Sequence, residues 1–304
     1  MSNLVVIIGP TASGKSQLAL RLAQQFDGEV VSADSRQVYC LMDIGTAKPG
    51  REEMSIIPHY LIDIINPDED FSLAQYQRLA YQKIADIQRH GKLPLLVGGS
   101  GLYVWAVVEG WVIPKVTPDP EFRRRLEGRA AQGEGDELYQ ELVQIDPAVA
   151  QRIDRRNVRR LIRALEVAYS GASRPQLSKV APPFQTLIIG LTAERKELYR
   201  RIDARVDRMI EQGLVDEVKR LIDMGFSMDL PAMSGIGYKQ ICLYLGGELT
   251  LGAAVQQIKN ETHRLVRRQY NWFRLKDERI KWFDIEDTKD EAEIEALVVG
   301  FISK

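Results

Sequence analysis

The sequence of 304 residues contains only two cysteines, Cys40 and Cys242, and three histidines. It has no CxxC pair and no histidine near a cysteine at ligand spacing, so it supports neither a disulfide framework nor a zinc site. We expect both cysteines to be buried apolar side chains. The apolar stretch in residues 1–10 is far too short to span a membrane, lacks a basic leader and runs directly into a motif. These absences predict a cytoplasmic protein with no membrane partner.

The net charge of -1 says little about partners until the charges are placed along the chain. Residues 151–182 carry eight lysines and arginines against two acids, whereas the stretch 284–304 is mostly acidic. The acidic stretch therefore hides a basic segment in the total. Such arginines ordinarily do no more than solvate helix faces, so the basic segment becomes informative only in combination with other features.

Short apolar runs alternate with helical patterns in the first third of the sequence. The runs at 3–9, 29–34 and 93–100 have the continuous apolar character of buried parallel strands. Helical periods at 16–26 and 72–91 separate them. Strands that alternate with helices indicate a parallel sheet covered on both sides, so the fold class is predicted to be α/β.

The pattern changes to helices alone in the middle of the chain. Asp119 and Asp146 are each followed by proline, which places an N-cap residue before a proline at the first helical position. Strand character returns at 185–192, and a later apolar run at 280–285 is typical of an edge strand. We therefore expect an all-helical insertion within one α/β core. The expected bounds are 1–113 and 186–304 for the two parts of the core and 114–185 for the insertion.

Residues 9–16, GPTASGKS, fit the pattern G-x-x-x-x-G-K-[ST] between the first strand and the first helix. The backbone N–H groups of such a loop and the N-terminus of the next helix favour an anion, and Lys15 adds a positive charge. The Ser16 hydroxyl can join the ligand shell of Mg²⁺. A chance match in a loop is the alternative interpretation, against which the flanking strand and helix argue. The motif indicates a P-loop core and a polyphosphate ligand, not a particular nucleotide.

An acid that is usual in P-loop enzymes is missing from the sequence. Enzymes that hydrolyse nucleotides normally also hold their metal with an acid at the end of an apolar strand. The candidate strand 93–103 ends in glycines and Ser100, no acid follows it, and no short arginine-bearing lid segment is apparent. These absences favour a reaction in which diphosphate leaves an electrophilic carbon. A P-loop kinase acting on a small metabolite and an RNA-binding ATPase without transferase activity are the alternatives.

Asp34 lies at the carboxyl end of the apolar run 29–34, where open α/β sheets place groups that contact ligands. If diphosphate is the leaving group, a carboxylate at this place can orient an acceptor and take its proton. The alternative is that Asp34 caps the following turn through its own side chain.

Eight motifs follow one another along nearly the whole chain. They are GPTASGKS, SADSRQVY, IGTAKP, PHYLIDI, VGGSGLY, RRLIRALEV, GIGYKQI and RRQYNWFR. In this order they resemble the tRNA dimethylallyltransferases, also called tRNA isopentenyltransferases. That family transfers a dimethylallyl group from dimethylallyl diphosphate to N6 of the adenine immediately 3′ of the anticodon, with Mg²⁺. Because no Cys or His pair follows the last motif, the chain resembles the compact bacterial type, for which a monomer is expected.

The resemblance implies roles for particular residues. The diphosphate of the prenyl donor would be bound by Gly9, Thr11, Ala12, Ser13, Gly14, Lys15, Ser16 and Arg205. Arg201 is close enough in sequence to compete with Arg205 for this role. Asp34 would be the general base toward the adenine amine, which is a poor nucleophile because its lone pair is delocalised into the ring. The anticodon stem-loop of tRNA would be contacted by Asp34, Ser35, Arg36, Gln37, Ser100, Arg123, Arg267 and Arg268.

Two further expectations concern residues within these motifs. Ser100 stands where the family more often has threonine, and the hydroxyl is kept. Aromatic side chains at helical spacing usually belong to the core, so we expect Trp272 and Phe273 to be buried while the neighbouring arginines contact RNA. The arginines between residues 152 and 163 can hold phosphates. His59 is expected to pack or to make a turn contact and not to take part in catalysis.

Overall fold

The computed structural model describes residues 2–114, 116, 119–171, 179–284 and 290–303. Contacts divide the chain into two compact units: unit 1 is Met1–Glu109 with Ala181–Lys304, and unit 2 is Gly110–Val180. Unit 2 begins and ends a few residues before the insertion expected at 114–185. The reason is an isolated antiparallel bridge between Trp111 and Lys179, beside which the N–H of Val180 donates to the carbonyl of Gly110 at 2.9 Å.

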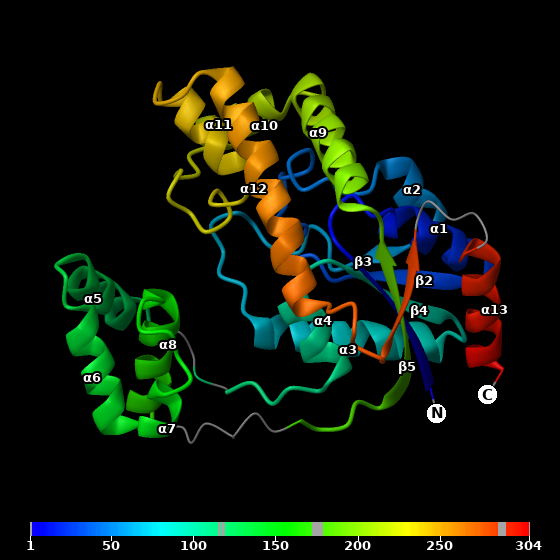
Figure 1. Cartoon of the computed structure of the whole chain (residues 1–304), viewed down its shortest axis with the longest axis horizontal. Coiled ribbons are helices and arrows are strands. Elements are labelled where there is room, and N and C mark those ends of the chain that lie inside the picture. The colour runs from blue at the N-terminus through cyan, green and yellow to red at the C-terminus, as the bar shows by residue number, and fades with distance from the viewer. Residues whose placement is uncertain (1, 115, 117–118, 172–178, 285–289, 304) are drawn as a thin grey trace. The chain divides into compact units, whose positions relative to one another are not determined.

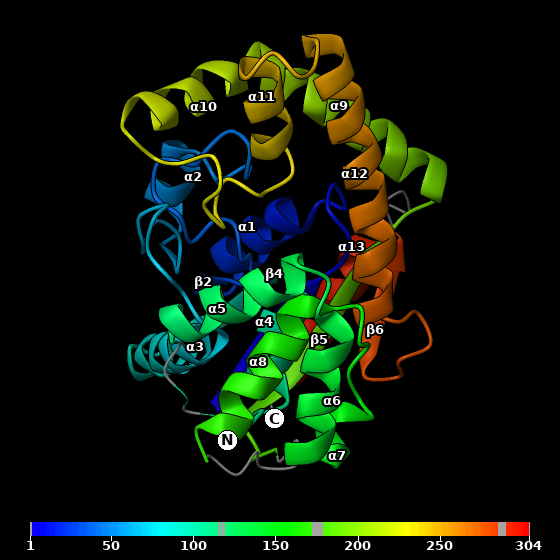
Figure 2. The ribbon, with the colours of Figure 1, turned by 90° about the vertical axis from the view of Figure 1, so that its left-hand side faces the viewer.

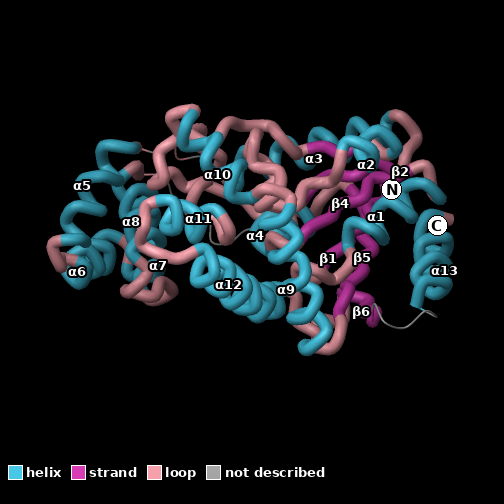
Figure 3. Tube along the Cα trace, turned by 90° about the horizontal axis from the view of Figure 1, so that it is seen from above, coloured by secondary structure: helices cyan, strands magenta, loops and turns pink. Residues whose placement is uncertain are grey.

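Unit 1 is built on a six-stranded sheet in which every pair of neighbouring strands is parallel, in the order β3-β2-β4-β1-β5-β6. The strands are β1 (Ser2–Ile8), β2 (Gly28–Ser32), β3 (His59–Tyr60), β4 (Leu93–Gly98), β5 (Phe184–Thr192) and β6 (Ile280–Asp284). Figure 3 shows them side by side with helices on both sides. The predicted α/β fold with a parallel sheet is confirmed, and β6 is the expected edge strand. The last residue of that expected strand, residue 285, lies outside the described residues.

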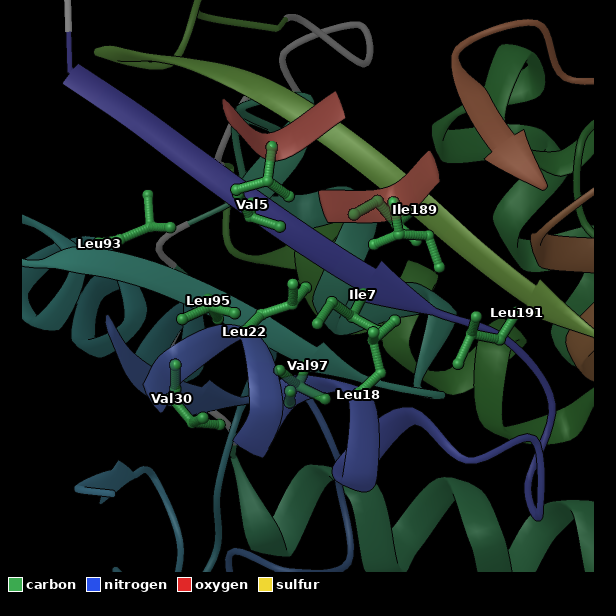
Figure 4. Close-up of a cluster of buried hydrophobic side chains, with 14 of the residues drawn as sticks. Val5, Ile7, Leu18, Leu22, Val30, Leu93, Leu95, Val97, Ile189 and Leu191 are labelled. Atoms are coloured by element: carbon green, nitrogen blue, oxygen red, sulfur yellow. The ribbon is translucent and has the colours of Figure 1, made fainter. Parts of the chain in front are cut away.

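Helices cover both faces of this sheet. Those nearest to it are α1 (Lys15–Gln25), α3 (Leu73–Arg89), α4 (Gly101–Val108) and α13 (Asp290–Ile302). Val5 and Ile7 of β1 pack in one apolar cluster with Leu18 and Leu22 of α1, as Figure 4 shows. The residues that alternate with them in β1 are buried as well, on the face that α3 covers. Burial on two faces is why β1 is a continuous apolar run.

Four helices of unit 1 form a second apolar cluster of their own. They are α9 (Arg195–Glu211), α10 (Leu214–Asp223), α11 (Tyr238–Leu245) and α12 (Leu251–Trp272), and they lie together in both Figure 1 and Figure 2. A short helix that the sequence did not predict, α2 (Arg51–Ile56), follows the loop after β2. Helix α12 contributes Ala254, Ile258 and Val266 to this cluster, and Gln269 near its C-terminal end contacts loops that follow strands of the sheet, as described below.

Unit 2 contains the helices α5 (Pro120–Ala131), α6 (Gly135–Ile145), α7 (Pro147–Ala150) and α8 (Val158–Tyr169). Both predicted caps are confirmed. Asp119 Oδ1 accepts from two backbone N–H groups at 3.0 Å, and Asp146 Oδ1 accepts from Val149 N at 3.0 Å. Leucines of α5, α6 and α8 form the core, among them Leu126 and Leu161. The helical insertion thus has its own apolar core.

Several smaller expectations can be compared with the structure. Cys242 is buried as expected, but the expectation for Cys40 is wrong: its side chain is partly exposed, because it lies in the loop after β2 and in no strand or helix. His59 makes the expected turn contact, with its Nδ1 2.8 Å from the carbonyl oxygen of Ile57. Across the ranges that the structure describes, no helix is long and apolar enough to cross a membrane.

Candidate active site

The loop of residues 9–14, called the phosphate loop below after its sequence motif, joins the end of β1 to the start of α1. Gly9 has φ +147°, and a Cβ on it would lie 2.4 Å from the carbonyl oxygen of Leu191, so only glycine lets the loop pass so close to β5. Ala12 and Gly14 have positive φ values of 66° and 77°. Gly14 is the N-cap of α1 and offers no side-chain cap, which leaves the first N–H groups of this helix free for an anion.

Three hydroxyl groups surround this turn. Ser13 is completely buried, and its Oγ has no hydrogen-bond partner among the described residues. A buried hydroxyl without a partner is costly unless a ligand completes it. The hydroxyl of Ser16, in the first turn of α1, is not bonded to any described residue, and Thr11 Oγ1 lies 3.4 Å from the guanidinium of Arg205.

Lys15 supplies the nearest positive charge. Its Nζ donates to the carbonyl of Pro10 within the loop at 2.6 Å. Burial, and after it the charge of Arg205, lower the pKa of Lys15 to about 8, while the carboxylate of Asp34 acts in the opposite direction. Lys15 is therefore held where positive charge is disfavoured, and an anion in the loop would relieve this.

Of the two candidate arginines on α9, only Arg205 reaches the phosphate loop. Burial lowers its pKa, and the charge of Asp34 opposes that shift. Arg201 instead donates from Nε to the carboxylate of Glu197, one helical turn away, at 2.6 Å. The geometry thus decides that Arg205, and not Arg201, faces the loop.

Asp34 lies two residues after the end of β2 and does cap the next turn. Its Oδ1 accepts from the backbone N–H of Arg36 at 2.8 Å, which is the alternative that the sequence left open. Its other oxygen, Oδ2, is bonded to none of the described residues. The charge of Asp34 also acts on Lys15 and Arg205, so the three groups share one site. Turn capping fixes the carboxylate and leaves one oxygen available for a proton.

The residues next to Asp34 are bonded mainly within unit 1. The backbone N–H of Ser35 donates to Ser100 Oγ at 2.9 Å, which joins the loops that follow β2 and β4. Arg36 Nη1 donates to the carbonyl of Pro231 at 2.9 Å, and Gln37 Nε2 donates to the carbonyl of Ala47 at 3.2 Å. In this structure Arg36 and Gln37 therefore hold neighbouring loops in place.

Gln269 of α12 belongs to this site and was not singled out from the sequence. Its Oε1 accepts from the N–H of Thr11 at 2.9 Å, and its Nε2 donates to the carbonyl of Gly99 at 3.1 Å. It thus ties the phosphate loop to the turn after β4. The signal was present, because Gln269 is an uncharged polar residue within RRQYNWFR, but the arginines and aromatic residues of that motif favoured an interpretation as an RNA contact.

The other side chains of that motif are divided between surface and core. Arg267 and Arg268 are exposed on α12. Phe273 is buried, as expected. The expectation for Trp272 is wrong, since 36% of it is exposed; it lies at the end of α12, where its ring covers Gly101 so closely that a Cβ there would meet it at 2.2 Å. The side chain of Trp272 is thus partly exposed to solvent and partly packed against Gly101.

Arg123 lies in unit 2 and is engaged by a buried acid. Its Nε and Nη2 donate to the two carboxylate oxygens of Glu166 at 3.0 and 2.9 Å. Glu166 is only 4% exposed and also accepts from Arg163 and from the N–H of Asp119. These contacts, opposed by burial, hold the pKa of Glu166 below its usual value. Arg123 thus joins α5 to α8 through two hydrogen bonds to Glu166.

No group of three or more histidine, cysteine or acidic side chains that could hold a metal occurs in the described ranges. A Mg²⁺ ion at this loop could take one ligand from a hydroxyl, with most other ligands supplied by phosphate oxygens and water. Mg²⁺ at phosphate sites is usually coordinated in this way, by few protein ligands together with phosphate oxygens and water. The free hydroxyl of Ser16 fits such an arrangement.

Comparison with known proteins gives concordant results. A family model described as IPP transferase matches residues 37–276. A curated tRNA dimethylallyltransferase from Dehalococcoides mccartyi is 50% identical over 305 residues, covering 100% of this chain and 94% of the relative. A protein of the same name from a Roseiflexus species is 53% identical over 277 residues, or 90% of each chain. The alignment with the Dehalococcoides relative spans this whole chain and so includes the phosphate loop and Asp34, which precede the family match.

Solved structures agree with these relatives. The full-length tRNA isopentenylpyrophosphate transferase of Bacillus halodurans has a TM-score of 0.75 and 42% identity, covering 100% of this chain and 97% of that one. A eukaryotic dimethylallyltransferase, seen in crystallographic snapshots acting on tRNA, has a TM-score of 0.84 and 28% identity over 100% of this chain and 80% of that one. The likeness thus covers both units.

Proposed function

Because the chain belongs to the IPP transferase family, we propose that it is a tRNA dimethylallyltransferase. The reaction moves a dimethylallyl group from dimethylallyl diphosphate to N6 of the adenine immediately 3′ of the anticodon and releases diphosphate. The observation that carries this proposal is the convergence of Asp34, Lys15 and Arg205 on one phosphate loop. Two cations and one carboxylate suit a reaction with an anionic leaving group and an acceptor that loses a proton.

The donor's diphosphate would lie in the phosphate loop. The free N–H groups at the start of α1, the unpartnered Ser13 hydroxyl and the charges of Lys15 and Arg205 supply donors and positive charge for it. Negative charge grows on the diphosphate as its bond to carbon breaks. The same groups are fixed in advance, so they stabilise this charge without rearrangement.

Mg²⁺ is part of the proposal. Ser16 would give it one oxygen ligand, and the ion would neutralise charge on the diphosphate when bound. Every other contribution comes from side chains and backbone groups of the chain itself.

Asp34 would act as the general base. As N6 of adenine forms its bond to the donor carbon, the bond from that carbon to the diphosphate oxygen breaks and one N6 proton passes to Asp34 Oδ2. The hydrogen bond from Arg36 N to Oδ1 keeps the carboxylate in one orientation during this step. The remaining proton on N6 stays on the product.

The RNA would approach from the side of Asp34. Ser35 and Ser100 join the two loops around this residue. Arg36 and Gln37 hold neighbouring loops in place and would contact the RNA at the border of this site. The exposed Arg267 and Arg268 and the arginines of unit 2, Arg123 among them, would contact phosphates. Taking one base out of an anticodon loop costs little, because that base is already unpaired.

The test is to incubate the protein with unmodified tRNA and dimethylallyl diphosphate, digest the RNA and analyse its nucleosides by mass spectrometry. We expect N6-dimethylallyladenosine at the position 3′ of the anticodon, only when donor and protein are both present. Folded protein that binds tRNA but leaves every nucleoside unmodified would contradict the proposal.

A further inference from the structure

A cavity of about 490 Å³ lies in unit 1, between the segment 43–54 and helix α9. Its volume is in the range of small-ligand sites. Its charged lining consists of Asp43, Lys48, Arg51, Asp63, Arg205 and Arg208. None of these residues except Arg205 belongs to the proposed active site, so the role of the cavity is open.

The charges that line this cavity do not balance. Lys48 donates to Asp43 Oδ1 at 2.7 Å and also pairs with Asp63, so both acids of the lining are already paired with a cation and the three side chains carry one net negative charge. Arg51 and Arg208 are exposed and pair with no acid in the described part of the chain, and neither does Arg205. Three guanidinium groups without acidic partners therefore face one cavity. Such groups favour a phosphate-like anion.

This positive charge continues into the phosphate loop. Arg205 lines the cavity and also reaches Thr11 Oγ1 at 3.4 Å. The charge of Arg208 is near enough to contribute to lowering the pKa of Arg205. The active-site loop and the cavity thus share one arginine.

The wall of the cavity is fixed by a buried carboxylate. Glu217 of α10, only 2% exposed, accepts from the backbone N–H groups of Asp43 and Ile44 at 3.0 and 2.8 Å. It also accepts from that of Gly45 at 3.2 Å and from the hydroxyl of Tyr238 at 2.6 Å. A loop whose three successive backbone N–H groups donate to one buried acid, itself bonded to α11, is preformed, so the cavity is a built feature of unit 1.

We propose that this cavity is a second anion site, which receives inorganic diphosphate as it leaves the phosphate loop. The assignment of diphosphate rests on the proposed function, because that reaction releases this anion in the loop that adjoins the cavity. Arg205 would stay in contact with the diphosphate throughout. Meanwhile the hydrogen bonds from the phosphate loop would be exchanged stepwise for hydrogen bonds from Arg51 and Arg208. The site would then shorten the time for which product blocks the loop.

The experiment is calorimetric titration of the full chain with inorganic diphosphate at fixed Mg²⁺. We expect two diphosphate sites in the parent. In the double variant Arg51→Ala, Arg208→Ala, the affinity of the second site should be lower by about tenfold or more. A variant with lysine at both positions keeps the charge and should keep two sites. Arg200→Ala is the control on the same helix, because Arg200 pairs with Glu197 and does not line the cavity.

One diphosphate site in the parent, or two of unchanged affinity in the alanine variant, would overturn this inference. So would displacement of the second diphosphate by an anticodon stem-loop RNA that the alanine variant binds more weakly, since the arginines would then serve RNA phosphates. Two diphosphate sites without any prenyl transfer would refute the proposed function and leave the anion site standing. Prenyl transfer by a protein with a single diphosphate site would support the proposed function and refute the second anion site.

Discussion

Arg123 of unit 2 and Arg205 of unit 1 look alike in the sequence and differ in the structure. Each lies on an arginine-rich helix, and the family resemblance implies a substrate contact for each. Arg123 uses two donors on the buried carboxylate of Glu166, whereas Arg205 has only the hydroxyl of Thr11 at 3.4 Å. The donors that Arg123 gives to a buried acid stabilise its own unit and leave only its remaining N–H groups for RNA, whereas Arg205, without an acid, has its guanidinium available to a ligand.

The comparison extends to the acids. Glu166 and Glu217 are buried and fully occupied by donors, so they hold helices and loops in place. Asp34 is only half occupied, with one oxygen bonded to Arg36 N. The groups that carry chemistry are thus those whose hydrogen bonding is incomplete. Variants of the two classes should fail in different ways.

The largest effect is expected at Asp34. Asp34→Asn keeps an oxygen for the Arg36 N–H but cannot take a proton, so the rate of prenyl transfer should fall by about 10² to 10⁴-fold. Single-turnover kinetics with saturating tRNA measure this, and a binding assay should give nearly unchanged affinity for tRNA. Equal rates of prenyl transfer for Asp34→Asn and the parent would show that Asp34 only caps its turn and is not the general base.

Arg205→Ala should give the next largest effect. Loss of a charged donor to the diphosphate predicts a decrease in kcat/KM for dimethylallyl diphosphate of about 10 to 100-fold, with little change in thermal stability. Arg201→Ala is the matched control, since Arg201 pairs with Glu197. If Arg201→Ala were the more damaging variant in steady-state assays, the assignment of the arginine that faces the loop would be wrong.

Arg123→Ala tests the opposite class. It leaves Glu166 buried with fewer donors, so we expect the free energy of unfolding of unit 2 to fall by about 1–3 kcal/mol. Hydrogen exchange of the amides of α5 and α8 reports this. Arg124→Ala, an exposed neighbour whose Nε contacts only the carbonyl of Pro120, should change it by less than about 0.5 kcal/mol. Unchanged exchange in Arg123→Ala would show that the pair with Glu166 does not stabilise the unit.

The smallest effect concerns pH. The charged form of Lys15 attracts diphosphate, and the pKa of Lys15 in the free protein is about 8. Bound diphosphate raises that pKa, so affinity should be fully present below pH 8 and fall by up to about tenfold per pH unit above it. Titration of the donor's affinity against pH measures this. Lys15→Arg should remove the dependence, and a persistent dependence in that variant would assign it to another group.

The sequence predicted the sheet, and a loop between β1 and α1, because their signals are local. A continuous apolar run predicted β1, and proline after aspartate predicted the starts of α5 and α7. The two-residue strand β3 was missed, because its pairing with β2 depends on residues about 30 positions away. Gln269 was missed for a related reason: its partners, Thr11 and Gly99, are brought to it only by the fold. Hydrogen-bond partners of arginines likewise depend on tertiary structure.

The most direct test of the central claim follows both groups that could be transferred, prenyl and phosphate, at once. Protein, tRNA, dimethylallyl diphosphate labelled in the prenyl group and ATP labelled in its terminal phosphate are mixed in one reaction. The account predicts one prenyl group entering RNA for each diphosphate released, with no transfer of phosphate from ATP. Label moving from ATP to an acceptor, with no prenyl group in the RNA, would contradict it.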